Sequence, residues 1–235
     1  MRKPVRDLAG AVSDISDGAT IMIGGFGGAG APVELVHALI DHGARELTVV
    51  NNNAGNGGVG LAALIRERRV AKMICSFPRS ADSTAFQDIY KEGAIQLELV
   101  PQGTLAERIR AGGAGIPAFY TRTCVGTPLA KGKPEAEFDG VRYVQERWLK
   151  ADFALVKAKR ADTHGNLVYN KTARNFAPLM CMAAATTIVQ VSEIVEAGAI
   201  DPEAVVTPGI FVNRLVEVPH PAQEEALVKQ GVRYP

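Results

Sequence analysis

Cysteine, aromatic residues and long apolar stretches are all scarce in this sequence. Its 235 residues include three cysteines, Cys75, Cys124 and Cys181, which are far apart and form no C-x-x-C pair. Such sparse thiols are typical of a reducing compartment and predict small buried side chains. The N-terminus lacks an apolar signal core, and no stretch approaches the ~18 apolar residues of a membrane span. We therefore expect a cytoplasmic protein without a membrane segment.

Charge of one sign is not in excess either. The 26 Lys and Arg residues nearly balance the 25 Asp and Glu residues, which excludes an electrostatic footprint for nucleic acid or anionic membranes. Gly-x-Ser-x-Gly and the phosphate loop are absent, so hydrolase and nucleoside triphosphatase functions are not indicated. The spacing of His37 and His42 does not place both on one helix face, and no metal site is predicted.

What the sequence does contain is an alternation of short apolar strands and helical segments. This pattern is typical of an α/β fold with a largely parallel sheet, and without a Ser/Gly linker we expect one domain over residues 1–235. The predicted strands are 19–23, 47–50, 70–75, 95–100, 141–145, 153–157, 167–169, 186–191 and 210–218. The predicted helices are 5–12, 33–40, 61–67, 83–91, 105–111, 177–185 and a solvent-side helix at 221–229, with a hairpin insert over 126–140 and a helix start at 201–202.

The most informative segment is the loop that follows the first predicted strand. Five glycines lie between residues 24 and 30, before a helix that begins near Pro32. A tight turn needs one or two glycines, so the surplus indicates a ligand that approaches the backbone closely. The helix start is expected to turn its free N–H groups and positive dipole end toward the same place. This loop therefore predicts a site for an anionic or polarised oxygen.

Part of the loop also satisfies a dinucleotide-binding pattern. Gly25, Gly27 and Gly30 fit G-x-G-x-x-G between a strand and a helix. Such a site also requires an acidic residue about 20 residues further on to hold the ribose hydroxyls. The second strand ends instead in Asn51-Asn52-Asn53. A Rossmann-type oxidoreductase is therefore a remote alternative, no NAD is expected, and a non-catalytic ligand-binding module on the same sheet is a further alternative.

Polar residues also follow other predicted strands. The asparagines from Asn51 and the amide of Gln102 both come directly after strands, whose carboxyl ends meet at one edge of a parallel sheet. Two alternatives are that the asparagines bond their own backbone and that Gln102 merely begins a helix. Arg174 is a candidate for pairing with a substrate carboxylate. Glu34 is explained by the dipole of the helix whose first turn it occupies.

Four separated blocks resemble the first subunit of the family I coenzyme A transferases. They are Asp17 to Pro32, Asn51 to Asn56, Val100 to Tyr120 and Ala173 to Phe176, and together they span most of the chain. The likeness is closest to the 3-oxoadipate and 3-oxoacid transferase A subunits. It implies a three-layer fold with helices on both faces of the sheet. It also implies a coenzyme A and active-site loop formed by Gly24, Gly25, Phe26, Gly27, Gly28, Ala29 and Gly30.

The resemblance further implies a reaction and a partner. Enzymes of this kind move coenzyme A from succinyl-CoA to a 3-oxo acid through a glutamyl-CoA thioester. Gln102 would help to stabilise the thioester oxyanion. The family's nucleophilic glutamate lies in a Ser-Glu-Asn-Gly motif, which is absent here, since Ser192-Glu193 is followed by Ile194. The resemblance therefore implies a second CoA-transferase subunit that carries this motif, in a heterodimer or heterotetramer.

The acceptor acid is left open between 3-oxoadipate, an intermediate of aromatic-compound catabolism, and acetoacetate. The two differ in a distal carboxylate but need the same thioester chemistry. The segment from Cys75 to Arg79 looks closer to the 3-oxoadipate group, whereas Cys124-Val125 departs from the Gly-Tyr of similar chains. The predicted substrate-binding residues are Asn51, Asn52, Arg79 and Arg174, with the two arginines as candidates for the distal carboxylate.

Overall fold

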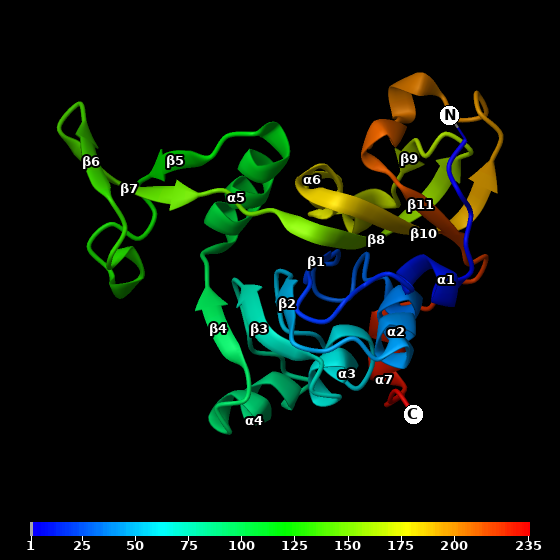
Figure 1. Ribbon diagram of the computed structural model, residues 1–235, viewed down its shortest axis with the longest axis horizontal. Helices are drawn as coiled ribbons and strands as arrows, with labels where there is room; N and C mark the ends of the chain where they lie inside the picture. Colours follow the sequence, from blue (N-terminus) through cyan, green and yellow to red (C-terminus); the bar gives the residue numbers. More distant parts are fainter. Residues whose placement is uncertain (1) are drawn as a thin grey trace.

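The centre of the molecule is an eight-stranded, largely parallel sheet between two layers of helices (Figure 1). The computed structural model describes residues 2–235. Seven strands follow the order β11-β10-β8-β1-β2-β3-β4, and β9 pairs antiparallel with β8. The strands are β1 Thr20–Ile23, β2 Leu47–Val50, β3 Val70–Cys75, β4 Gln96–Leu99, β8 Ala151–Asp162, β9 Leu167–Val168, β10 Ala184–Val195 and β11 Arg214–Glu217.

Helices cover both faces because side chains of the inner strands alternate between them. Ile21 and Ile23 pack into the core cluster shared with α1 to α4, whereas Met22 packs into the cluster shared with α5 and α6. The predicted three-layer α/β fold is therefore confirmed. The helices are α1 Leu8–Val12, α2 Val33–His42, α3 Gly60–Arg66, α4 Ala85–Lys91, α5 Gln102–Ala114, α6 Ala177–Ala183 and α7 Glu224–Lys229. Within residues 2–235, none of them has the length and hydropathy to cross a membrane.

The chain reverses its direction across the sheet at β1. From β1 it steps outward through β2, β3 and β4, and it then returns to β8, which pairs with β1 on the opposite side. From β8 it continues outward through β10 and β11. Right-handed crossovers in opposite directions place their helices on opposite faces. Such a reversal leaves a crevice at the carboxyl ends of the two central strands, and the loop after β1 lies there.

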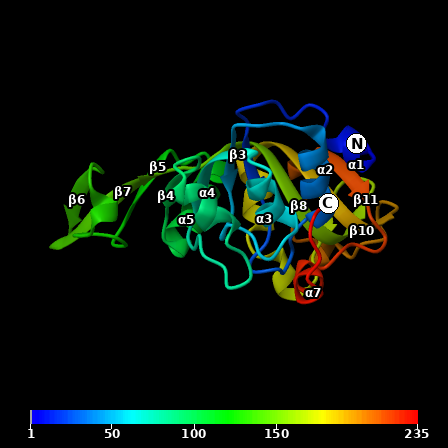
Figure 2. The ribbon, with the colours of Figure 1, turned by 90° about the horizontal axis from the view of Figure 1, so that it is seen from below.

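A second sheet projects from the end of the molecule that carries α5 (Figures 1 and 2). It consists of β5 Ala118–Thr121, β6 Glu135–Phe138 and β7 Val141–Arg147, in the antiparallel order β5-β7-β6. The short helix η1, Pro128–Ala130, precedes β6. The hairpin predicted for this region is confirmed as the β6–β7 pair.

Several element boundaries differ from the prediction for local reasons. The first helix begins at Leu8, since Asp7 caps it and Val5 forms a bridge with Leu215. The last strand begins only at Arg214, after the 3-10 turn η4 at Gly209–Phe211, and the helix start at 201–202 gives one 3-10 turn, η3 Pro202–Ala204. The helix predicted at the end of the chain is confirmed as α7, whose side chains are mostly exposed or half-buried. Its first residue, Glu224, is the exception at 3% exposed, because α7 packs back onto the loops that follow β1 and β2.

Candidate active site

Hydrogen bonds join the ends of three strands at the rim of the sheet. Asn52, after β2, accepts bonds on Oδ1 from Gln102 Nε2 at 2.9 Å and from Ser76 Oγ at 2.7 Å. Gln102 is the first residue of α5 and is exposed, and its amide carries a second N–H for another acceptor. The structure therefore brings Asn52 and Gln102 together, as the sequence predicts, and adds Ser76.

The neighbouring asparagines bond the backbone. Asn51 is 4% exposed, and its Nδ2 donates to the carbonyl of Ile23 at 2.6 Å, while its Oδ1 accepts from the Asn53 N–H at 2.8 Å. Asn53 Oδ1 in turn accepts from Gly55 N at 2.8 Å. Asn51 thus ties the end of β2 to the start of the glycine loop, defined as residues 24–30. Roles of Asn51 and Asn52 in substrate binding remain predictions.

The glycine loop presents free backbone donors at its tip. Phe26 and Ala29 pair across a tight turn, with N···O distances of 3.0 and 3.1 Å. Among residues 2–235, the N–H groups of Gly27 and Gly28 between them have no protein acceptor. Gly27 has φ +56°, and a Cβ added there would find no heavy atom within 4 Å. The tip therefore combines unbonded donors with open space at Gly27, which is the cradle expected for a polar ligand.

Asn175 supports the other side of this loop. Its Nδ2 donates to the Ala29 carbonyl at 2.9 Å, and its Oδ1 accepts from Gly25 N at 3.3 Å. A Cβ on Gly30 would lie 2.2 Å from the carbonyl oxygen of Ala173. Asn175 itself has φ 22° and ψ −113°, an unusual conformation that these contacts hold in place. The resemblance pointed to this block, but the sequence pattern favoured the neighbouring arginine rather than Asn175.

At the start of α2, a buried side chain of the protein accepts a hydrogen bond from the backbone. Leu35 N donates to Gln190 Oε1 at 3.3 Å, and Gln190 Nε2 donates to Glu34 Oε2 at 2.5 Å. Gln190 is completely buried in β10. The expectation that the free N–H groups of this helix start face a ligand is therefore wrong for Leu35. The loop supplies further donors, described above.

Arg79 and Arg174 lie on separate exposed segments. Arg79 is in the loop after β3, and Arg174 ends the short helix η2, Lys171–Arg174. Within residues 2–235, neither guanidinium bonds to the glycine loop or to Gln102. Their proposed contact with a distal substrate carboxylate therefore remains a prediction.

Two groups that resemble nucleophiles do not fit that role. Burial raises the pKa of Cys75, at the end of β3, to about 12, so this thiol remains protonated at neutral pH. Glu193, the residue nearest to the expected motif, is exposed on β10 and pairs with Arg160 at 2.9 Å. No group of three His, Cys, Asp or Glu residues within 2–235 is arranged to hold a metal ion.

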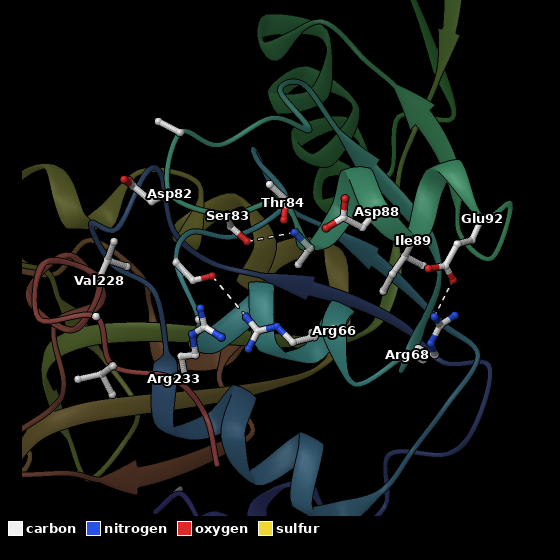
Figure 3. A pocket seen from close by; sticks show the side chains of 16 residues that line it. Arg66, Arg68, Asp82, Ser83, Thr84, Asp88, Ile89, Glu92, Val228 and Arg233 are labelled. Carbon is white, nitrogen blue, oxygen red and sulfur yellow. Dashed lines mark hydrogen bonds and ion pairs between the residues drawn. The ribbon is translucent and has the colours of Figure 1, made fainter.

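A wider cavity of about 690 Å³ lies away from the rim, between α3, α4 and the end of the chain (Figure 3). Three arginines and three carboxylates line it, and Arg68 pairs with Glu92 at 2.6 Å. The mixed charge does not select an anionic ligand, and none of the predicted site residues lies in its wall. Its charged lining residues are Arg66, Arg68, Asp82, Asp88, Glu92 and Arg233.

The protein has an open α/β sheet, and its glycine loop lies where the strand order reverses at β1. These features are typical of the class of proteins that bind ligands at the carboxyl ends of their strands. Comparison with known proteins identifies the family within this class. The description of the matching family is Coenzyme A transferase, and the match covers residues 5–218. The chain belongs to the coenzyme A transferase family. Asn51 occupies the position where a dinucleotide site needs an acid, and its amide donates to the carbonyls of Ile23 and Gly24 instead.

Two curated relatives match nearly the whole chain. The A subunit of the 3-oxoadipate CoA-transferase of Acinetobacter baylyi is 58% identical over 92% of this chain and 95% of its own length. The A subunit of the succinyl-CoA:3-ketoacid coenzyme A transferase of Xanthomonas campestris is 53% identical over 95% of this chain and 91% of its own length.

Among solved structures, the acyl-CoA transferase YdiF of Escherichia coli O157:H7 superposes with a TM-score of 0.85 at 24% identity. The match covers 94% of this chain but 48% of YdiF, so this chain spans about half of that longer protein. At this identity the likeness shows the fold alone.

Proposed function

We propose that this chain is the first of the two subunits of a coenzyme A transferase that moves coenzyme A from succinyl-CoA to a 3-oxo acid, with 3-oxoadipate as the acceptor. The 58% identity to the corresponding chain of a 3-oxoadipate CoA-transferase, over nearly the full length of both, carries this proposal. The 53% identity to the corresponding chain of a succinyl-CoA:3-ketoacid transferase makes acetoacetate the alternative acceptor.

The geometry supports a role in binding the oxygen of the thioester. Negative charge develops on that oxygen when a nucleophile attacks, and fixed donors directed at it lower the barrier. The loop supplies the N–H groups of Gly27 and Gly28, and the rim supplies the second N–H of Gln102. Asn52 and Ser76 fix the Gln102 amide, and Asn175 fixes the loop. These groups would bind and polarise the acyl-CoA, while the nucleophile comes from elsewhere.

We assign the nucleophile to a second polypeptide, called the partner chain here. Ser-Glu-Asn-Gly is absent from the 235 residues, and Glu193, whose sequence context is nearest to that motif, forms an ion pair with Arg160. Both curated relatives are themselves named as one subunit of a transferase, which supports the need for a second subunit. A glutamate on the partner chain would carry first the acyl group and then coenzyme A as a thioester, in a heterodimer or heterotetramer.

Co-expression with a candidate partner chain tests this proposal. The assembled protein should exchange coenzyme A between succinate and 3-oxoadipate, and borohydride should trap the thioester on a glutamate of the partner chain. Robust exchange by the isolated chain, or a trapped adduct on one of its own glutamates, would overturn the assignment of the nucleophile to a second polypeptide.

The choice of acceptor is tested separately. We expect 3-oxoadipate to exceed acetoacetate in kcat/KM, and Arg79→Ala or Arg174→Ala should reduce that preference by about tenfold if the guanidinium pairs with the distal carboxylate. The alternative acceptor is established if acetoacetate is favoured by about tenfold, which corresponds to about 1.4 kcal/mol of transition-state preference.

A further inference from the structure

The last segment of the chain lies outside the family match and crosses both loops of the candidate site. The match ends at residue 218, and residues 219–235, called the strap here, include α7. The strap runs past the glycine loop and past the loop of residues 53–60, which connects β2 to α3. Figure 2 shows α7 at the lower edge of the view, below α3 and β8. Figure 3 shows Val228 and Arg233 of the strap in the wall of the wider cavity.

Polar contacts anchor the strap at its start. Glu34 Oε1 accepts from Ala222 N at 2.5 Å, and Lys157 Nζ donates to the Ala222 carbonyl at 2.8 Å. The carboxylate of α2 and the ammonium of β8 thus hold the N–H and the carbonyl of one residue. At the other end, Tyr234 N donates to the Gly58 carbonyl at 2.8 Å, and its hydroxyl bonds to Asp41. The strap is therefore fixed to the sheet, to α2 and to the 53–60 loop.

The glycines of the two loops make room for the strap. A Cβ on Gly57 would lie 2.6 Å from Val228 Cγ2, and one on Gly58 would lie 2.7 Å from Arg233 Cγ. A Cβ on Gly28 would lie 3.0 Å from the backbone nitrogen of Glu225. Any side chain at these positions would push the strap away. Glycine at positions 28, 57 and 58 therefore allows the strap to pack closely against the two loops.

Glu224 lies where the two loops meet. Its Oε2 accepts from Asn56 Nδ2 at 2.9 Å and would lie 3.5 Å from a Cβ on Gly28, whereas its Oε1 would lie 3.1 Å from a Cβ on Gly60. It shares a narrow cavity with the glycine loop and Asn51. Burial raises the pKa of this carboxyl to about 7, and the Asn56 bond and Lys157 act in the opposite direction. An almost fully buried carboxyl with one hydrogen bond is costly, and such groups are retained mainly where position matters.

We propose that the strap, through the Glu224–Asn56 hydrogen bond, positions the glycine loop and the 53–60 loop for coenzyme A transfer. Glu224 is thus a positioning residue that acts through the loops. This inference rests on the proposed function of the glycine loop, because the loop must bind the reacting thioester for its position to affect the rate. A displacement of about 1 Å at such a site can change a rate by about 100-fold.

The test uses the assembled transferase with four variants. Glu224→Ala removes the acceptor, and Glu224→Gln keeps an amide oxygen for Asn56. Asn56→Ala removes the same bond from the other side, together with the bond that Asn56 Oδ1 accepts from Ser80 Oγ. Glu225→Ala is the matched control, because Glu225 is exposed and pairs with Lys229 within the strap. We expect Glu224→Ala and Asn56→Ala to lower kcat between about tenfold and about 100-fold, with KM for succinyl-CoA changed less than about threefold. Glu224→Gln and Glu225→Ala should stay within about threefold of wild type.

Hydrogen exchange gives a readout that does not depend on activity. Residues 24–30 and 53–60 should exchange faster in Glu224→Ala but not in Glu225→Ala, with the central sheet unchanged. The double variant Glu224→Ala/Asn56→Ala should lose no more activity than Asn56→Ala alone, because Asn56→Ala already removes the bond to Glu224 together with the bond from Ser80 Oγ at 3.2 Å. Four outcomes would each overturn the positioning role of Glu224. They are additive losses in the double variant, an unchanged kcat in Glu224→Ala, equal losses in Glu224→Ala and Glu224→Gln, and unchanged hydrogen exchange in the two loops. A wild-type complex that moves no coenzyme A would refute the proposed function instead, while the exchange result would still stand.

Discussion

Replacement of Glu224 by Gln should change how the stability of the protein depends on pH. The carboxyl is buried against the two loops, and burial raises its pKa from an ordinary value of 4.5 to about 7. Glutamine has nearly the same shape and keeps an acceptor for Asn56, but it never carries a charge. The substitution therefore isolates the free energy of ionising this one buried group.

The direction of this pH dependence follows from the linkage between proton binding and folding. An acid with a raised pKa in the folded protein binds its proton more tightly there than in the unfolded chain, so folding loses stability as pH rises from about 4.5 through about 7. The cost is about 1 kcal/mol near pH 5 and about 3 kcal/mol near pH 8. Glu224→Gln avoids it, so its stability relative to wild type should improve by about 2 kcal/mol between these pH values.

Thermal unfolding of the assembled protein at fixed concentration measures this difference. About 2 kcal/mol corresponds to a gain in relative Tm of roughly 4–8 °C for a chain of this size. Glu225→Gln is the control, since its carboxylate is exposed and the bond to Lys229 lowers its pKa, so this group stays ionised between pH 5 and pH 8 and the variant should run parallel to wild type over that range. Parallel pH curves for wild type and Glu224→Gln would show that the Glu224 carboxyl does not carry a raised pKa in the folded state.

Three further substitutions test the loop and the rim. Gln102→Ala should assemble normally but lose about 2–4 kcal/mol of transition-state stabilisation if its amide holds the oxyanion, and wild-type turnover would remove Gln102 from the site. Gly30→Ala should lower Tm, because its Cβ would lie 2.2 Å from the Ala173 carbonyl oxygen at φ +79°, and an unchanged Tm would contradict this packing. Gly27→Val should cost about 1–2 kcal/mol in stability but far more in kcat, because its side chain enters the open space over the tip. Circular dichroism must show that Gly27→Val is folded, and normal turnover by this variant would place the ligand elsewhere.

Local pattern was sufficient to predict the central sheet. The strands at Ala19 to Ile23 and Leu47 to Val50 are short, apolar and followed by turn residues, and each lies within one residue of its predicted boundary. Their buried side chains face two different cores, which is why apolar residues follow one another in Ile21–Ile23 and Val49–Val50 rather than alternating with polar ones. The meeting of Asn52 with Gln102 also followed from pattern, since both come after strands of the same parallel sheet.

Contacts between residues far apart in sequence could not be predicted in this way. The C-terminal helix contains Glu224 beside Glu225, two charged residues that periodicity assigns to solvent, yet the first is buried and the second is exposed. Gln190 looks like an ordinary polar residue in a strand, but it bonds Leu35 and Glu34 across 155 and 156 residues. Only the three-dimensional fold brings these partners together, and no local signal in the sequence marks them.

The pairing of β1 with β8 has a consequence for the order in which the protein folds. Ile21 pairs with Phe153, and Gly24 N donates to the Leu155 carbonyl at 2.9 Å, so the base of the glycine loop rests on a strand more than 100 residues away. Strands β1 to β4 pair with strands that are near in sequence. The pairing of β1 with β8 closes a much longer stretch of chain, so it should form late in folding. We therefore expect the loop to acquire its final shape in the last stage of folding. Substitutions where β1 pairs with β8 should then slow the recovery of loop structure during refolding more than they slow the formation of helices.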